Sequence, residues 1–122
     1  MAAVPPSRID TNYLAFRAAL GELRDLLREY APEQPWADRA AHALRLTEAG
    51  DAGGFDHWLG AYGGMGSIND LSIDWALRLT PEEHAAVAQR IDRLCTRCGE
   101  LAAQLRADIA ENARAGEPGW PG

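Results

Sequence analysis

Apolar residues recur at helical spacing in three stretches of the chain. Between residues 10 and 30, and again between 81 and 113, they follow one another at alternating intervals of three and four; a shorter apolar face spans 35–49. This spacing places side chains on one face of a helix. The two long stripes consist of Tyr13, Phe16, Leu20, Leu23, Leu27 and Tyr30, and of Val87, Ile91, Leu94, Cys98, Leu101 and Leu105. We therefore predict helices over 10–30, 35–49 and 81–113.

Capping residues set the expected helix starts. Thr80-Pro81-Glu82-Glu83 combines a hydroxyl at the N-cap, proline at the first helical position and glutamate at the third, which is a capping box. Asp10 or Thr11 is a suitable N-cap for the first helix, and Pro35 a suitable first residue for the second. A short fourth helix is expected over residues 55–61, where the apolar side chains again share one face. Residues 1–8 are interpreted as a loose lead-in.

The chain between residues 63 and 79 lacks a helical pattern. Three glycines stand among residues 63–66, and apolar and polar residues then alternate from Leu71 to Leu79. Alternation is typical of a strand, but no other segment could pair with it. We expect an extended or irregular segment against the core, with a short helix as the alternative. Gly64 and Gly66 are expected to hold backbone angles that a side chain would strain.

Composition strengthens the helical interpretation. Among 122 residues there are 23 Ala and 14 Leu, but only 2 Val, 5 Ile and 4 Thr, which favours helices over strands. We predict an all-α fold: an irregular four-helix bundle with a glycine-rich loop before a long C-terminal helix. Residues 1–116 form one domain, and 117–122 a disordered tail outside the fold.

The C-terminal helix is long for such a domain. It spans about 50 Å at 1.5 Å per residue, whereas a compact domain of this size is about 35 Å across. It should therefore overhang, bend or bridge to a second subunit in a homodimer. Because the apolar stripe thins after Ile109, we expect a solvated overhang at the C-terminal end.

Charge is unevenly distributed. The formal net charge is -6, and residues 48–74 contain five acidic residues and no basic one. Such a stretch attracts basic partners and argues against nucleic-acid binding. No apolar run is long enough for a membrane span and no signal peptide is evident, so we expect a cytoplasmic protein without membrane contacts.

The two cysteines do not suggest a cofactor. Cys95 and Cys98 lie within the predicted last helix, without the βαβ setting of a redox pair or further ligands at zinc-site spacing. We interpret both as buried helix residues and expect no metal or other cofactor.

One short run carries a resemblance. Gly64-Met65-Gly66-Ser67-Ile68-Asn69-Asp70-Leu71, preceded by Trp58-Leu59-Gly60-Ala61-Tyr62-Gly63, resembles a family of small bacterial proteins of unassigned function with a GMGS-x-ND signature. The resemblance implies a helical fold around the loop. It also implies a setting among contact-dependent toxins, in which small acidic helical proteins act as immunity proteins.

We therefore expect an immunity protein that neutralises a basic bacterial toxin through an acidic surface. Aromatic and aliphatic side chains would anchor the interface and carboxylates would surround them. The candidate contact residues are Asp56, Trp58, Tyr62, Met65, Ser67, Asn69, Asp70 and Asp74. The alternative for Trp58 is a position in the core, and the alternative for Asp70 is a local turn in which its carboxylate accepts backbone N–H groups.

Two alternatives remain open. One is a structural or interaction module that forms a helical homo-oligomer. The other is a small metal-dependent enzyme with Asp56, His57, Asp70, Asp74 and Ser67 in its site. We place the enzyme last because these residues lie in or beside a glycine loop, without recognisable ligand spacing; the chain is not expected to be an enzyme.

Overall fold

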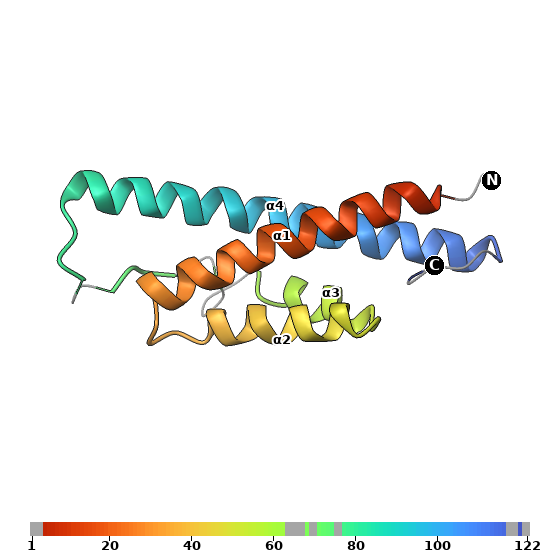
Figure 1. Ribbon diagram of the computed structural model, residues 1–122, viewed down its shortest axis with the longest axis horizontal. Coiled ribbons are helices and arrows are strands. Elements are labelled where there is room, and N and C mark those ends of the chain that lie inside the picture. Colours follow the sequence, from red (N-terminus) through yellow and green to blue (C-terminus); the bar gives the residue numbers. More distant parts are fainter. Residues whose placement is uncertain (1–3, 63–67, 69–70, 75–76, 117–119, 121–122) are drawn as a thin grey trace.

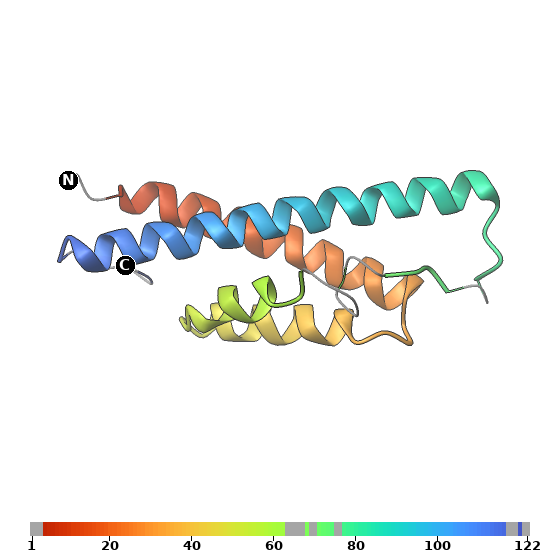
Figure 2. The same cartoon turned by 180° about the vertical axis from the view of Figure 1, so that it is seen from behind.

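The computed structural model describes residues 4–62, 68, 71–74, 77–116 and 120. Four helices follow one another: α1 (Pro6–Tyr30), α2 (Trp36–Glu48), α3 (Gly53–Leu59) and α4 (Pro81–Arg114). Helix α1 packs against both α4 and α2, and α3 packs against α2 and α4. Figures 1 and 2 show α1 and α4 as a crossing antiparallel pair, with α2 and α3 together on one side of it. The prediction of an all-α, four-helix arrangement with a long C-terminal helix is confirmed.

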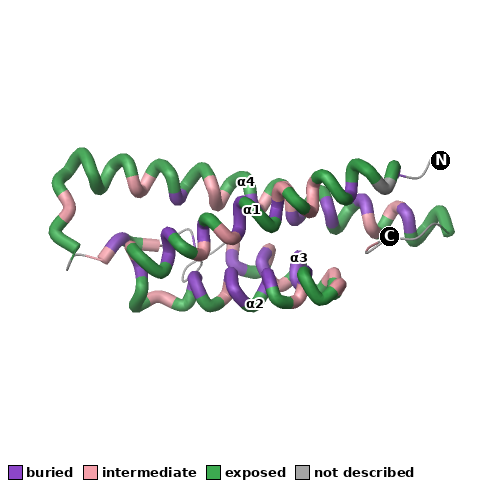
Figure 3. Tube along the Cα trace, in the orientation of Figure 1, coloured by how far each residue is buried: buried purple, intermediate pink, exposed green. Residues whose placement is uncertain are grey.

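The core lies where the four helices meet. Figure 3 shows buried positions gathered on the inward faces of α1, α2 and α3 and along the second half of α4. The predicted stripe of α1 supplies its centre, and α3 adds two large aromatic side chains. The fully buried apolar side chains include Phe16, Leu20, Leu23, Leu27, Ala40, Ala43, Phe55, Trp58, Cys98, Ala102 and Leu105.

Helix α1 begins earlier than predicted. Its first residue is Pro6, four positions before Asp10, and no side chain caps it. Proline suits the first turn because the missing N–H would have no helical partner there. Val4 and Ile9 are buried in the core cluster. The interpretation of residues 1–8 as a loose lead-in is therefore wrong for the described residues from Val4 onward.

The remaining helix boundaries lie close to the predictions. Helix α2 is one residue shorter at each end, and it closes with Gly50 at a φ of 84°. The N–H groups of Gly50 and Asp51 bond to the carbonyls of Thr47 and Leu46, a Schellman motif. Helix α3 starts two residues early, because the Asp51 carboxylate accepts a hydrogen bond from the Gly53 N–H and turns the chain there.

Helix α4 begins with the predicted capping box. The Thr80 hydroxyl accepts from the Glu83 N–H, and the Glu83 carboxylate accepts from the Thr80 N–H, each at 3.1 Å. The hydrogen bond from the Thr80 backbone lowers the pKa of the Glu83 carboxyl. This local signal is therefore correctly interpreted from the sequence.

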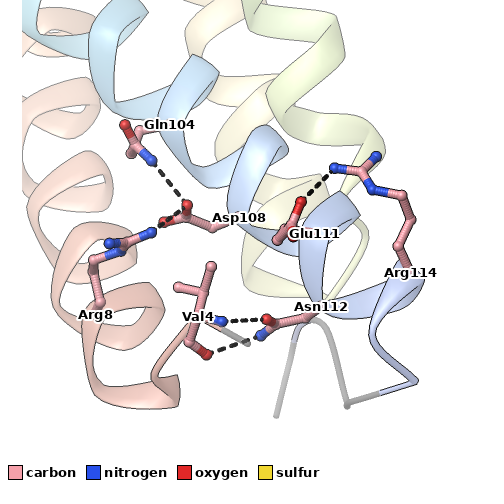
Figure 4. A network of polar contacts seen from close by, with 7 residues as sticks. All are labelled: Val4, Arg8, Gln104, Asp108, Glu111, Asn112 and Arg114. Carbon is pink, nitrogen blue, oxygen red and sulfur yellow. Dashed lines mark hydrogen bonds and ion pairs between the residues drawn. The ribbon is translucent and has the colours of Figure 1, made fainter. Parts of the chain in front are cut away.

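The expected solvated overhang is at the wrong end of α4. Near the C-terminal end, Asp108 and Asn112 are 3% and 1% exposed, and they bind Arg8 and Val4 across the start of α1 (Figure 4). It is the N-terminal end, residues 81–86, that is exposed along its whole length. The polarity of Asp108 and Asn112 favours exposure to solvent in the sequence, but both side chains are buried, and Arg8 and Val4 supply their hydrogen-bond partners.

Two further segments pack against the helices. The described residues of 71–79 contain no strand and no α-helix, and Leu77 lies in a 3₁₀ turn; the Asp74 N–H donates to the Tyr30 carbonyl at 2.8 Å. Trp120 packs against Tyr13 and Phe55, with ring centroids 5.1 and 5.2 Å apart. Placing Trp120 outside the fold was therefore wrong, because its indole covers apolar surface at the α1–α3 contact.

Among the described residues, no helix combines the length and the hydropathy that crossing a membrane requires.

Candidate partner-binding groove

An open groove of about 660 Å³ lies between the first half of α4 and a wall formed by Ile68 and residues 71–73. Helices α1 and α4 diverge from their crossing point toward the end of α1 (Figures 1 and 2). The groove is lined by Ile68, Leu71, Ser72, Ile73, His84, Ala88, Ile91, Asp92 and Cys95.

The α4 wall follows from helical geometry. His84, Ala88, Asp92 and Cys95 recur at intervals of three and four, so they form one stripe along α4. This stripe is displaced from the predicted core stripe, whose member Ile91 borders the groove and is buried. The core stripe packs toward α1, whereas the stripe from His84 to Cys95 faces the groove.

The opposite wall is aliphatic. Ile68 and Ile73 are buried, and Leu71 is half-buried beside them. The segment is held in place by backbone contacts, because the Ser72 carbonyl accepts a hydrogen bond from the Gln34 side chain. Of the alternating apolar residues noted in the sequence, Leu71 and Ile73 line the groove, together with Ser72 between them.

The cysteines contribute apolar surface rather than a reactive thiol. Cys98 is buried and Cys95 half-buried at the end of the groove. Burial raises the pKa of both thiols to about 12, with the Asp92 carboxylate adding to the effect at Cys95. At neutral pH both thiols are protonated and therefore weak nucleophiles.

A hydrogen-bonded chain joins α3 to α4 at Cys95, which also lines the groove. The Trp58 indole N–H donates to the Tyr62 hydroxyl at 2.9 Å, and that hydroxyl donates to the Cys95 carbonyl at 2.5 Å. The Tyr62 ring can reach α4 because residue 99 is glycine: a Cβ there would lie 3.2 Å from the ring. Burial raises the pKa of Tyr62 well above its usual range, so the hydroxyl remains a donor.

This arrangement decides between the two interpretations of Trp58. Trp58 is 0% exposed and belongs to the core, so it cannot serve as an interface anchor. Tyr62 is half-buried, and its hydroxyl is committed to the contact between α3 and α4. Trp58 and Tyr62, two of the candidate interface residues, instead fasten α3 to α4.

The structure partly neutralises the acidic stretch. Arg106 of α4 pairs with Asp56 at 3.0 Å, and Arg17 of α1 lies 3.7 Å from Glu48. All four side chains are between 45% and 62% exposed, so these pairs contribute little stability. The acidic region is therefore less negative in space than along the chain.

The predicted contact carboxylates do not share one surface. Asp56 pairs with Arg106, in the second half of α4, whereas Asp74 lines a small cavity with His84, in its first turn. These two α4 positions are about 33 Å apart along the helix axis. Asp74 borders the groove, because Ile73 and His84 line both cavities, but Asp56 does not.

Four predicted contact residues lie outside the described part of the chain: Met65, Ser67, Asn69 and Asp70. Gly64 and Gly66 lie outside it as well, so their predicted backbone angles stay predictions.

The sequence interpretation missed the α4 wall of the groove. Ala88 and Asp92 are four residues apart, but alanine and aspartate do not form an apolar stripe that periodicity would detect. The signal that could have located them is the excess length of α4, since residues beyond the crossing point must expose a face. It also missed the Asp108 and Asn112 contacts of Figure 4.

Two residues of the alternative enzyme site, Asp56 and His57, contact different neighbours. Asp56 faces Arg106, while the His57 ring lies against His42 with centroids 4.6 Å apart. Burial, with Arg39 and His42 nearby, lowers the pKa of His57, and the Arg39 guanidinium binds the His57 carbonyl. Within the described residues, no group of three or more His, Cys, Asp or Glu side chains is arranged to hold a metal ion.

One protein family is similar to part of the chain. Residues 29–78 match a family described as Domain of unknown function (DUF6966). No curated protein and no solved structure matches. The matched 50 residues, out of 122, run from the end of α1 through α2 and α3 to the segment before α4. The similarity to this family therefore includes the loop wall of the groove and leaves out the α4 wall.

Proposed function

We propose that this chain is a protein-binding module whose groove holds an apolar segment of a partner protein. The observation that carries the proposal is an open hollow with a mainly aliphatic lining, from Ile68 and Ile73 on one wall to Ala88 on the other. Concave apolar surface of this kind typically receives a ligand or a partner. Binding to the partner would then be sufficient for the function of this protein, and no catalytic group would be needed.

The partner that we propose is a basic bacterial toxin, which makes this chain a cytoplasmic immunity protein. The net charge of -6 favours association with a basic protein and accelerates it. Asp92 stands among the aliphatic residues of the groove, so the inserted segment should combine apolar side chains with an arginine or lysine. The resemblance of the run from Trp58 to Leu71 agrees with this setting.

In this proposal the contact surface differs from the one expected on sequence grounds. Asp74 remains at its edge, and Leu71, Ala88 and Asp92 replace Trp58 as contact residues. Asp56 acts only through the overall charge, because it lies near the far end of α4. The toxin would be inhibited because this chain binds it and blocks part of its surface.

The test uses the product of the adjacent gene as the candidate toxin. Bacteria express it alone, with this chain, or with an Ala88→Arg variant. Ala88 lines the groove and is half-buried, so arginine both fills it and places a charge in it. The matched control is Ala86→Arg, two positions away on the exposed side of α4. We expect growth with the wild type and the control, and growth arrest with Ala88→Arg.

Circular dichroism establishes that both variants fold. Protection by folded Ala88→Arg equal to that of the wild type would exclude the groove as the contact surface. Sedimentation of the chain alone tests the homo-oligomer alternative: a dimer that Ala88→Arg dissociates, with no protection from the toxin, would assign the groove to a second copy of the chain.

A further inference from the structure

A second, shallower pocket of about 340 Å³ lies at the opposite end of the bundle from the groove. The first half of α1, the end of α2 and Trp120 surround it. The residues that line it are Asp10, Tyr13, Thr47, Glu48, Ala49, Gly50 and Trp120. Neither the predicted contact residues nor the proposed groove includes this pocket.

Two aromatic rings form one side of the pocket. The rings of Tyr13 and Trp120 lie 5.1 Å apart at an interplanar angle of 51°, and both residues are half-buried. Trp120 rests on the buried ring of Phe55, at 5.2 Å and 56°. The indole is thus held with part of its surface available, and the face of an aromatic ring attracts a cation.

The other side of the pocket is negative. Asp10 is exposed, and no ion pair within the described part of the chain includes it. The Glu48 carboxylate has Arg17 at 3.7 Å, but both side chains are about half exposed. Helix α2 ends at this pocket, with Gly50 in the left-handed conformation. The C-terminal end of a helix has a partial negative charge that favours cations.

We infer that this pocket binds the guanidinium group of an arginine side chain from a polypeptide partner. Ring faces, carboxylates and a helix C-terminus converge on one hollow, and each of the three favours a cation. Arginine fits better than lysine because its planar group stacks on aromatic rings while it pairs with carboxylates. The inference rests on the proposed function in one respect, namely that the arginine belongs to the toxin.

The pocket can be tested without the toxin. The probe is the tripeptide acetyl-Gly-Arg-Gly-amide, and its neutral isostere has citrulline in place of arginine. Both are titrated against the labelled full chain at low salt, while nuclear magnetic resonance follows the indole N–H of Trp120. We expect a saturable shift with the arginine peptide only, and weaker binding as salt is added.

Variants locate the binding site. Asp10→Asn removes one charge from an exposed side chain, and we expect it to weaken binding about fivefold, as one unit charge about 4 Å away in water would. The matched control is Glu29→Gln, which removes an exposed carboxylate from the last turn of the same helix. We expect this variant to bind like the wild type.

Three results would overturn the inference: no saturable shift of the Trp120 signal, an equal shift with the citrulline peptide, or unchanged affinity in Asp10→Asn. Failure of the proposed function would be detected separately, as loss of the growth difference between Ala88→Arg and Ala86→Arg. If the chain binds the arginine peptide but gives no protection, the inference about the pocket stands and the proposed toxin partner is rejected.

Discussion

Asn112→Ala tests whether the two ends of the described chain hold each other. The Asn112 carboxamide accepts a hydrogen bond from the Val4 N–H at 2.8 Å and donates one to the Val4 carbonyl at 3.2 Å (Figure 4). Asn112 is 1% exposed and Val4 7%. One turn away, Arg8 binds the buried carboxylate of Asp108 through two nitrogen atoms, at 2.8 and 3.2 Å.

The expected cost follows from two routes that the variant can take. If Val4 stays in place, its N–H and carbonyl are buried without the carboxamide, at about 1–3 kcal/mol for each unsatisfied group. If Val4 detaches, both groups reach water, but the apolar burial of its side chain is lost, at about 1.5–3 kcal/mol. The cheaper route sets the limit, so we expect the free energy of unfolding to fall by about 2 kcal/mol.

Urea denaturation measures this change. With a denaturant slope of about 2 kcal/mol per molar, the unfolding midpoint should fall by about 1 M. Amide hydrogen exchange distinguishes the routes, because detachment removes the protection of the Val4 amide and spares that of Leu23 in the core. Glu100→Ala is the control: it truncates an exposed side chain of the same helix and should change stability by less than about 0.5 kcal/mol.

A loss below about 0.5 kcal/mol in Asn112→Ala, with the Val4 amide still protected, would refute this reasoning. It would mean that the start of α1 is held by its own packing and by Arg8, and that the buried carboxamide adds nothing.

The remaining predictions concern the two cysteines and two helical glycines. Burial raises the pKa of Cys95 and Cys98 from 9.0 to about 12, so the unfolded chain releases these two protons at lower pH than the folded chain. The thiols should therefore leave the free energy of unfolding unchanged below about pH 9 and lower it between pH 9 and 12, which urea midpoints measure. In a Cys95→Ala, Cys98→Ala double variant this decrease should be smaller. Both thiols should react slowly with a thiol reagent at neutral pH, and rapid labelling of the folded chain would contradict this. Gly21→Ala, which meets no atom within 4 Å, should stabilise the chain by about 0.5–1 kcal/mol. Gly99→Ala should gain less in thermal unfolding, because its Cβ would meet the Tyr62 ring at 3.2 Å, and an equal gain at both positions would mean that this ring shifts freely.

Local signals in the sequence were sufficient to predict the four helices. The apolar stripe from Phe16 to Leu27 is buried as predicted, and the Thr80–Glu83 capping box forms. Such signals act between residues within one or two turns, so their effect does not depend on the rest of the fold. The start of α1 is the exception: Pro6 begins the helix without a side-chain cap, and contacts with α4 support it.

Charge and burial depended on partners distant in sequence. Asp56 lies in a stretch without basic residues, yet Arg106, 50 positions later, pairs with it. Asn112 and Asp108 have the composition of a solvated helix end, but partners 108 and 100 positions earlier bury them. No pattern within one helix contains that information, because it arises only when α4 packs against α1 and α3.

The groove and the pocket likewise form only in the tertiary structure, because their walls come from segments distant in sequence. By itself the sequence determined four helices, their main apolar faces and an irregular segment before α4. Packing decided that Trp58 is core, that Trp120 covers Tyr13, and that residues 81–86 of α4 stand away from α1. A groove and a pocket are spaces between elements, and their walls come from residues that periodicity assigns to different helices.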